Sequence, residues 1–550
     1  MTHRARHAAL LLSMLGATLT GCSSDEAGAD GAGGCGDVSC APTGGEGGSG
    51  GAGGGGRVSG ADAEGGSSAD AENATGQGGG GLGSGAGDGG FGPEPPPECD
   101  TCCSGAPDVG EPRYVVRVDD SNSFASPFLV DALLPDWNGV TPLPVRTHEF
   151  LNVYGTRLED DFTGNDLVFD WGAAPIAELD GEHLVALQVA VRHLATADRP
   201  QRTVALVVDT SPSIAPSSRS TDAAIDAVVG QLGPADRLGV YSWSPDPLRR
   251  ELRPMSDVGN LDREALEGAV VRAVEAREPG AEPGTALRTA IEQATLAATA
   301  RTSVLLVSDG STGIDDDTLE LVREAAAGEQ RVRVVGIGVG PARAYSDEVL
   351  DAITDVSGGA SMYFDGSPAA QALIQDRFRE LVDVAKSDVR LRLSMPGSAE
   401  LVVTSAGDAS GVGDGEVAGQ NLAADGTMTF HEVVRWTGDP TATPCEGIGW
   451  ILEDSNGEIG RGEIAFGDVM ARRAITPATH DGLAVVAAAA ALEGPTAERL
   501  ARAFAAMEDA FAARGTWAGT RLQPLCASLT AACARLDLPC SACPVEASAP

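Results

Sequence analysis

The 550-residue sequence predicts an α/β protein: a doubly wound parallel sheet, flanked by β-rich segments and followed by a helical, cysteine-containing region. Two observations predict the central sheet. Between about residues 200 and 386, short and almost wholly apolar runs alternate with amphipathic segments, which is typical of buried parallel strands covered by helices. Polar residues follow directly after several of these runs, where open α/β sheets place their ligand sites.

Residues 1–22 are predicted to direct export. A short basic start is followed by an apolar run, Ala8–Leu19, of roughly a dozen residues, whereas a membrane-spanning helix needs about 20. The run ends in Leu19-Thr20-Gly21-Cys22, which resembles the lipobox of bacterial lipoproteins. That resemblance implies acylation of Cys22, and Ser23 after it implies delivery to the outer membrane in a Gram-negative cell. An ordinary secretory signal is the alternative, and both export the protein.

Residues 23–98 are predicted to form a flexible, disordered tether. The segment consists mostly of Gly with Ala, Ser and Asp, and it lacks the apolar residues that would build a core. Its end is stiffened by Pro93-Glu94-Pro95-Pro96-Pro97. We therefore expect the folded part of the protein to stand away from its membrane anchor.

Residues 99–199 are predicted to form an α+β flank. Tyr114–Val118 has the pattern of a strand, Phe124–Leu134 and Arg146–Val153 have that of helices, and Leu184–Val191 alternates as a strand does.

Residues 200–386 carry the α/β alternation. Asp222, Asp262 and Ser346 are expected to cap helices at their N-termini, and Gly358 is expected to end the last of these helices. The expected strands are Val204–Val208, Leu238–Trp243, Val304–Val307, Val332–Ile337 and Ser361–Phe364.

Residues 387–475 are predicted to form antiparallel β structure, and residues 476–550 a helical, Cys-rich segment. Helical patterns cover Leu483–Leu492 and Ala497–Ala513. The expected strands are Val389–Leu393, Leu401–Thr404, Thr427–Trp436 and Ile448–Leu452.

The cysteines favour disulfides. Of eleven cysteines, ten remain once Cys22 is set aside, and export places them in an oxidising compartment. The sequence does not determine their pairing. Zinc binding by Cys99-x-x-Cys102 and Cys540-x-x-Cys543 is the alternative, although no histidine lies near either pair.

The charge of the chain excludes several functions. A formal net charge of -41 argues against binding of nucleic acid or anionic lipid, so membrane attachment is expected through the lipid anchor alone. The single lysine, Lys386, follows Ala385, whereas a phosphate-binding P-loop needs Gly before its Lys. Nucleotide hydrolysis by that route is therefore excluded.

Three loops between the predicted elements of residues 200–386 carry oxygen-bearing side chains. Asp209, Ser211 and Ser213 come directly after the first strand, Thr285 opens a helix, and Asp309 follows the third strand. Loops at the carboxyl ends of parallel strands converge, so these five side chains are expected to meet. Such oxygens suit Mg²⁺, or another hard divalent cation such as Mn²⁺ or Ca²⁺, and the absence of His and Cys disfavours zinc.

This order of loops, Asp-x-Ser-x-Ser, then Gly-Thr, then Ser-Asp-Gly, looks like the metal-ion-dependent adhesion site (MIDAS) of von Willebrand factor A domains. The likeness covers roughly residues 203–385. It implies that the two serines of the first loop are direct metal ligands, and that Asp209, Thr285 and Asp309 coordinate directly or through water. It also implies an open coordination position that accepts a carboxylate from a partner protein.

Two positions depart from that motif. Pro212 stands where the family commonly has Gly, and Ile214 where it commonly has Met. Neither change removes a ligand, but Pro212 is expected to hold Ser211 in an extended conformation. Metal selectivity is the property that these departures affect.

The flanks resemble those of bacterial A-domain lipoproteins, in the segments Tyr114–Asp120 and Val140–Tyr154. This resemblance implies that the chain before residue 200 and after residue 386 forms two halves of one β-rich support. Two independent domains are the alternative.

The sequence thus favours a non-enzymatic function: cation-dependent protein binding at the bacterial cell envelope. A metal-stabilised structural envelope protein is one alternative, in which Asp209, Ser211 and Ser213 need only satisfy turns and helix caps. A hydrolase is another. The one Gly-x-Ser-x-Gly motif, Gly47–Gly51, lies in the tether without the strand and helix that would expose a nucleophile.

Overall fold

The computed structural model describes residues 107–544 apart from residues 117–122, 157, 159–165, 180–181, 195–198, 277–282, 405–410, 413–418, 440–442, 518–520 and 539. The predicted signal peptide, the lipidation site Cys22, the tether and Cys99-x-x-Cys102 lie outside these residues. Within the described part of the chain, no helix combines the length and apolar character needed to cross a bilayer.

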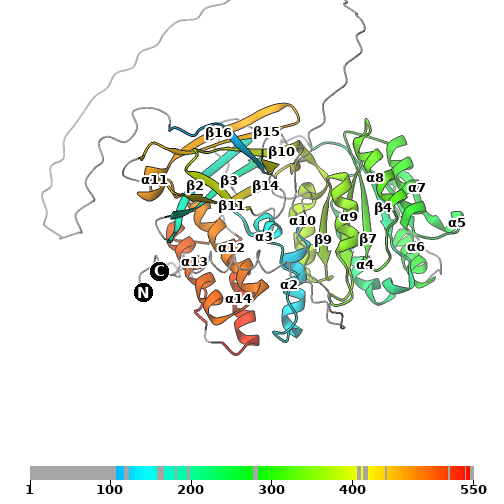
Figure 1. Cartoon of the computed structure of the whole chain (residues 1–550). Helices are drawn as coiled ribbons and strands as arrows, with labels where there is room; N and C mark the ends of the chain where they lie inside the picture. Colours follow the sequence, from blue (N-terminus) through cyan, green and yellow to red (C-terminus); the bar gives the residue numbers. More distant parts are fainter. Residues whose placement is uncertain are drawn as a thin grey trace, which may run out of the picture. The chain divides into compact units, whose positions relative to one another are not determined.

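A six-stranded sheet forms the core of the central region (Figure 1). Its strands lie in the order β6-β5-β4-β7-β8-β9. Strands β4, β5, β7, β8 and β9 are parallel, as their buried apolar sequences predict, and β6 pairs antiparallel with β5 at one edge. The strands are β4 (Arg202–Val208), β5 (Arg237–Ser242), β6 (Glu251–Asp257), β7 (Arg301–Ser308), β8 (Arg333–Val339) and β9 (Ala360–Phe364).

Helices cover both faces of this sheet, because alternate strand residues point to opposite sides. Val204 and Leu206 of β4 share one apolar cluster with helices α4, α6 and α10, whereas Ala205 and Val207 share another with α7, α8 and α9. The fold is therefore doubly wound, as predicted. The helices are α4 (Ser218–Gly230), α6 (Arg263–Ala276), α7 (Pro283–Leu296), α8 (Asp316–Ala327), α9 (Glu348–Ser357) and α10 (Pro368–Val382), with the one-turn α5 (Pro247–Arg250) before β6.

Two of the predicted helix caps are wrong. Helix α4 begins four residues before Asp222, which lies inside it, because the helix continues directly from the 3₁₀ turn η2 (Pro212–Ser217). Asp347, not Ser346, precedes α9. The cap by Asp262 is confirmed by a hydrogen bond from the Ala265 amide (3.0 Å), and Gly358 ends α9 in the left-handed conformation.

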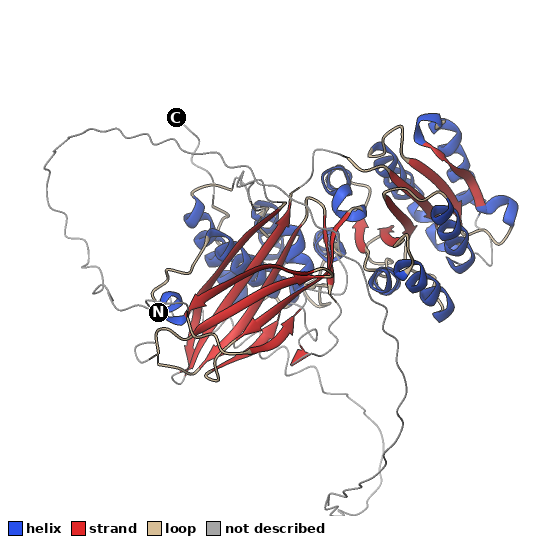
Figure 2. Cartoon of the chain, turned by 90° about the horizontal axis from the view of Figure 1, so that it is seen from above, coloured by secondary structure: helices blue, strands red, loops and turns tan. Residues whose placement is uncertain are grey.

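Two antiparallel sheets make up the region that we call the support (Figure 2). One has the order β12-β1-β10-β15-β16, with β13 paired to β10, and the other β11-β14-β3-β2. Each sheet contains strands from before and after the central region, so the two flanks form one β structure. The strands are β1 (Pro112–Val116), β2 (Leu167–Leu179), β3 (Glu182–His193), β10 (Val384–Ser394), β11 (Ala399–Thr404), β12 (Gly411–Val412), β13 (Gln420–Ala423), β14 (Thr427–Trp436), β15 (Gly447–Asp454) and β16 (Gly457–Ala465).

The core of the support lies between its sheets. Val189 and Val191 of β3 and Phe430 of β14 meet Leu391 of β10 and Trp450 of β15 in one buried cluster. Cross-strand apolar residues on facing sheets interdigitate in this way in β-sandwiches. The support therefore has its own hydrophobic core.

Helices pack against the support and the central sheet. Helix α12 contacts β2, β3 and α3, and α2 contacts β9, where the Phe124 amide donates to the Ser361 carbonyl (2.9 Å). The helices are α2 (Ala125–Leu133), α3 (Thr147–Tyr154), α11 (Phe466–Met470), α12 (Pro477–Glu493), α13 (Ala497–Arg514) and α14 (Leu522–Arg535), and η1 (Leu134–Asp136) and η3 (Val258–Asn260) are short 3₁₀ turns.

The chain enters and leaves the central region at one ion pair. Arg202, the first residue of β4, donates from Nε to Oδ1 of Asp383, which directly follows α10 (2.9 Å). Both side chains are buried, and the guanidinium also lies 5.6 Å from the centre of the Phe378 ring. The two ends of the inserted region are thus joined by a paired, hydrogen-bonded charge.

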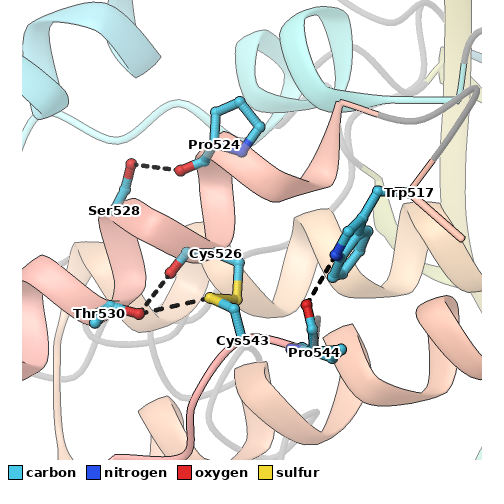
Figure 3. The surroundings of a disulfide bond; sticks show 7 residues. All are labelled: Trp517, Pro524, Cys526, Ser528, Thr530, Cys543 and Pro544. Carbon is cyan, nitrogen blue, oxygen red and sulfur yellow. Dashed lines mark hydrogen bonds between the residues drawn. A yellow bond between two sulfur atoms is a disulfide. The ribbon is translucent and has the colours of Figure 1, made fainter. Parts of the chain in front are cut away.

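Two disulfides hold the C-terminal segment to α14, and Figure 3 shows one of them, Cys526–Cys543. Cys526 pairs with Cys543, and Cys533 pairs with Cys540. The two cysteines of Cys540-x-x-Cys543 therefore bind different partners on α14, which excludes the zinc alternative for this motif. Nearby, the indole of Trp517 donates to the Pro544 carbonyl (2.9 Å).

Candidate metal site

The two predicted carboxylates lie at the carboxyl edge of the central sheet. Asp209 follows β4 directly, and its amide donates to the Val307 carbonyl of β7 (2.9 Å), which extends the pairing of these strands. Asp309 follows β7 in the same way. Both side chains are buried. Their convergence results from the parallel pairing of β4 and β7.

Hydrogen bonds fix both oxygens of Asp209. Oδ1 accepts from the Ser211 amide (2.8 Å), and Oδ2 accepts from the hydroxyl of Ser308 (2.7 Å). Burial raises the pKa of Asp209 to about 6, although these hydrogen bonds to the charged form act in the opposite direction. A cation placed beside this carboxylate would favour its ionised form.

Three serine hydroxyls and Asp309 form a continuous series of oxygen atoms. Ser211 Oγ lies 2.8 Å from Ser213 Oγ, which lies 2.6 Å from Ser311 Oγ. The Ser311 hydroxyl is in turn 2.7 Å from Asp309 Oδ1. Ser213 and Ser311 are exposed, so this series opens to solvent at one end.

Ser311 is absent from the residues that the sequence singles out. It lies two residues after Asp309, and its amide also donates to Asp309 Oδ1 (2.9 Å). The sequence signal for it is weak: one more serine after Ser308-Asp309-Gly310. Gly310 has φ +69°, and a Cβ there would lie 1.8 Å from the Ser346 carbonyl oxygen, so only glycine fits this turn.

The first loop adopts the conformation that its proline predicts. Ser211 has φ -63° and ψ 158°, which is extended, and Pro212 begins the 3₁₀ turn η2. Ile214, the second departure from the motif, is fully buried in the cluster beneath α4. The two departures therefore shape and anchor the loop without supplying or removing an oxygen.

Thr285 lies near the start of α7, half-buried. The helix starts of α7 and α8 are in close contact, since a Cβ on Gly284 would lie 2.5 Å from the hydroxyl of Thr318 in α8. Helix α8 follows the loop that carries Asp309 and Ser311. Four of the five predicted residues, Asp209, Ser211, Ser213 and Asp309, are thus joined by hydrogen bonds, the last two through Ser311. The fifth, Thr285, lies at the start of the neighbouring helix α7.

The chemistry of the set fits a hard cation. It contains two carboxylates and several hydroxyls, and within the described residues no group of three or more His, Cys, Asp or Glu side chains is arranged to hold a metal. Neither Asp209 nor Asp309 forms an ion pair with an Arg, Lys or His in that part of the chain. Oxygen donors without nitrogen or sulfur suit Mg²⁺, Mn²⁺ or Ca²⁺.

A family model for the von Willebrand factor type A domain matches residues 202–363, the segment that forms the central sheet. This chain contains a von Willebrand factor type A domain. The match spans the A domain's strands β4 to β9 and includes all five predicted site residues. No curated protein matches the chain.

Solved structures with similar folds include a von Willebrand factor type A protein from Catenulispora acidiphila, at 15% identity and a TM-score of 0.39, covering 65% of this chain and 89% of that one. The pilus adhesin SpaC from Lactobacillus rhamnosus GG has 14% identity and a TM-score of 0.26, covering 56% and 48%. Proximal thread matrix protein 1 from the mussel byssus, described with a zinc-occupied MIDAS motif, has 15% identity and a TM-score of 0.25, covering 32% and 47%.

Proposed function

We propose that this protein binds a protein partner at the bacterial cell envelope through a divalent cation held at the carboxyl edge of its A domain. The observation that carries the proposal is the solvent-open series of oxygens from Ser211 through Ser213 and Ser311 to Asp309. Such a series gathers partial and full negative charge at one point, and no described cationic side chain pairs with its carboxylate. A hard divalent cation balances that charge.

Each residue has a distinct part in the proposed site. Ser211, Ser213 and Asp309 would hold the cation, with Thr285 approaching from α7. Asp209 is buried and both of its oxygens accept hydrogen bonds, so it would act on the cation through its charge or through water. Once bound, the cation supplies an open coordination position for a carboxylate of the partner. Mg²⁺ is the first candidate because oxygen donors and retained waters suit its octahedral geometry.

A cavity of about 350 Å³ beside the site offers further contact area to a partner. Thr210, which follows Asp209, lines it together with Ser244, Leu248 and Arg272. Leu248 is largely exposed, and an apolar side chain next to an ionic site is typical of protein-binding surfaces. The partner would therefore place an Asp or Glu at the cation and neighbouring residues over this cavity.

The sequence supports display of this site on the cell envelope. The predicted signal peptide, acylation at Cys22 and the Gly-rich tether would attach the protein to a membrane by lipid and leave its folded part free to meet a partner. Attachment to the outer membrane follows from Ser23 if the cell is Gram-negative.

A pull-down from envelope extract tests this function. The wild-type protein is expected to capture partners in Mg²⁺ and to lose them in chelator, and Asp309→Ala is expected to lose them in both conditions. Asp316→Ala is the matched control, since Asp316 is an exposed carboxylate in the first turn of α8. Retention of the same partners by Asp309→Ala and in chelator would refute the proposal.

A metal-stabilised structural protein is the second candidate, favoured by the burial of Asp209 and its bond to Ser308. It predicts that Asp209→Ala lowers the melting temperature and leaves every partner interaction unchanged. Measuring melting and capture on the same variant separates the two functions.

A further inference from the structure

A second cavity, of about 660 Å³, opens in the support. It is remote in sequence from residues 209–213 and 309–311, which we call the metal loops. Its walls come from β2, β16, α11 and the segment before α12, and its polar lining includes Glu463, Asp468, Arg473 and Thr476. A volume of this size lies within the range of about 300–1,000 Å³ that is typical of small-molecule sites. The cavity is therefore large enough for a ligand of one to a few rings.

Trp171 supplies an aromatic surface in this cavity. It is 39% exposed, whereas each of the other five tryptophans is at most 8% exposed. Trp171 lies on β2, an edge strand, opposite Val189, so its ring points toward the space between the sheets where the sandwich opens. An indole that stays partly exposed in a hollow offers a ligand an aromatic face to stack on.

The Trp171 ring is held in place by its neighbours. It meets the Trp450 ring edge-on, with 5.3 Å between the ring centres and 64° between the planes, and Phe169 lies 6.2 Å from the same ring. Aromatic pairs favour this edge-to-face arrangement. The platform is thus formed before any ligand arrives, which lowers the entropy lost on binding.

The opposite wall is fixed by hydrogen bonds to the same strand. The Ala173 amide of β2 donates to the Ala474 carbonyl (2.9 Å), and the Thr476 hydroxyl donates to Asp170 Oδ1 (2.7 Å). Thr476 also caps α12 by accepting from the Thr479 amide. The segment before α12 is therefore held against β2.

Charged groups with planar arrays of donors and acceptors line the mouth. Arg473 Nη1 lies 3.7 Å from Asp468 Oδ1, with both side chains about half exposed, and Glu463 lines the cavity from β16. A guanidinium presents several N–H donors in a plane, and a carboxylate presents two acceptors. Such groups match the adjacent hydroxyls of a sugar.

We propose that this cavity binds a pyranose unit of an envelope glycan, independently of the metal site. The C–H groups on the flat face of a pyranose carry partial positive charge and stack on the negative face of the Trp171 indole. The hydroxyls at the ring edge would bond Arg473, Asp468 and Glu463. A proline-rich peptide fits less well, since peptides of that kind use grooves lined by several aromatic rings and Trp171 is the one exposed aromatic of this lining.

A glycan array covering the common hexoses and N-acetylhexosamines, probed with the full chain in the presence of chelator, tests the proposal. Binding to at least one pyranose class is expected. Titration of that oligosaccharide should shift the Trp fluorescence and protect it from iodide quenching, because Trp171 is the exposed tryptophan. Binding that occurs in Mg²⁺ but disappears in chelator would refute the assignment, since it would locate the glycan at the metal loops.

Variants locate the site. Trp171→Phe keeps a smaller ring in place and is expected to weaken binding about tenfold, and Arg473→Ala to weaken it about fivefold, both with unchanged far-ultraviolet circular dichroism. Glu275→Ala, at an exposed position of α6, is the control and should bind the glycan as the wild type does. Affinity that is unchanged in both cavity variants, an array with no signal, or competition by a proline-rich peptide alone would each overturn the inference.

Discussion

Two regions of this protein bury carboxylates, and the groups that hydrogen-bond to these carboxylates differ between the regions. At the carboxyl edge of the A domain, Asp309 accepts from the amide and the hydroxyl of Ser311, and within the described residues it has no cationic partner. Where the support meets α12, the fully buried Asp481 accepts from Arg514 (2.7 Å) and from the Thr156 hydroxyl. The first region lacks a positive charge and the second contains one.

This difference separates the proposed binding site from a contact that holds the fold. Thr156 and Asp481 lie 325 residues apart, and Gln188, also at this junction, donates to Ala478 across 290 residues. Such contacts exist only when the whole support has assembled. The metal loops, by contrast, need only the ends of the paired strands β4 and β7, where Ser213 lies beside Ser311 and Asp209 beside Ser308. Changes at the junction should therefore reduce stability, and changes at the loops should reduce binding.

The largest expected effect is at the junction. Asp481→Ala leaves the Arg514 guanidinium without its buried partner, so the free energy of unfolding should fall by about 3 kcal/mol. Urea denaturation followed by circular dichroism measures this change. Glu275→Ala, at an exposed position of α6, serves as the control and should stay within about 0.5 kcal/mol of wild type. An Asp481→Ala protein as stable as the control would break the comparison.

Acid should destabilise the same junction through His431. Burial lowers the pKa of His431, beside Gln188, to about 4, from an ordinary value of 6.5. Between these values the unfolded chain binds the proton and the folded chain does not, so stability falls as the pH drops from 6.5 to 4, by about 3 kcal/mol.

Other buried groups titrate in the same range, and the pKa of Glu149 is raised by burial to about 7, which acts with the opposite sign. The quantity to compare is therefore the loss of unfolding free energy on acidification in wild type and in His431→Gln. Unfolding free energies at pH 7 and pH 4.5 should show a smaller acid loss in the variant. Equal losses in both proteins would contradict the role given to His431.

At the metal loops, an added cation should stabilise the protein. At a concentration of about 100 times the dissociation constant, Mg²⁺ or Mn²⁺ should raise the free energy of unfolding by about 2–3 kcal/mol, and chelation should reverse this. Asp309→Ala should unfold at the same denaturant concentration with or without the cation. A cation effect that survives in Asp309→Ala would place the metal elsewhere.

The smallest effect is expected for Ser311→Ala. Its hydroxyl contacts Ser213 and Asp309 but is no part of the motif, so its loss should weaken cation binding only a few-fold, or about 1 kcal/mol. Isothermal titration with Mn²⁺ measures the affinity. Ser213→Ala, which removes a proposed ligand, provides the comparison and should weaken binding more. A reversed order would make Ser311 the ligand.

The sequence predicts the A domain well because its signals are local. Asp209, Ser211 and Ser213 follow a buried β-branched strand within five residues, and the confirmed doubly wound fold derives from patterns of similar length. The metal coordination itself stays a prediction.

Elements whose own sequence gives a weak or contrary local signal were missed. Strand β2 contains Asp170, Gly172 and Pro175, which disfavour a strand, and it exists because β3 and α12 cover it. The Gly-rich β16 is an edge strand with little apolar pattern. Helix α14, which carries Pro524 close to its start, is held by two disulfides whose pairing the sequence leaves open.

The buried pair of Arg202 and Asp383 has a mechanical consequence. The A domain is an insertion between β3 and β10 of the support, and this pair joins its point of entry to its point of exit. Tension between the two ends of the chain is therefore carried by the support strands and bypasses the A-domain sheet. A pull applied at the metal loops, in contrast, reaches the support through the two chain connections that this pair joins.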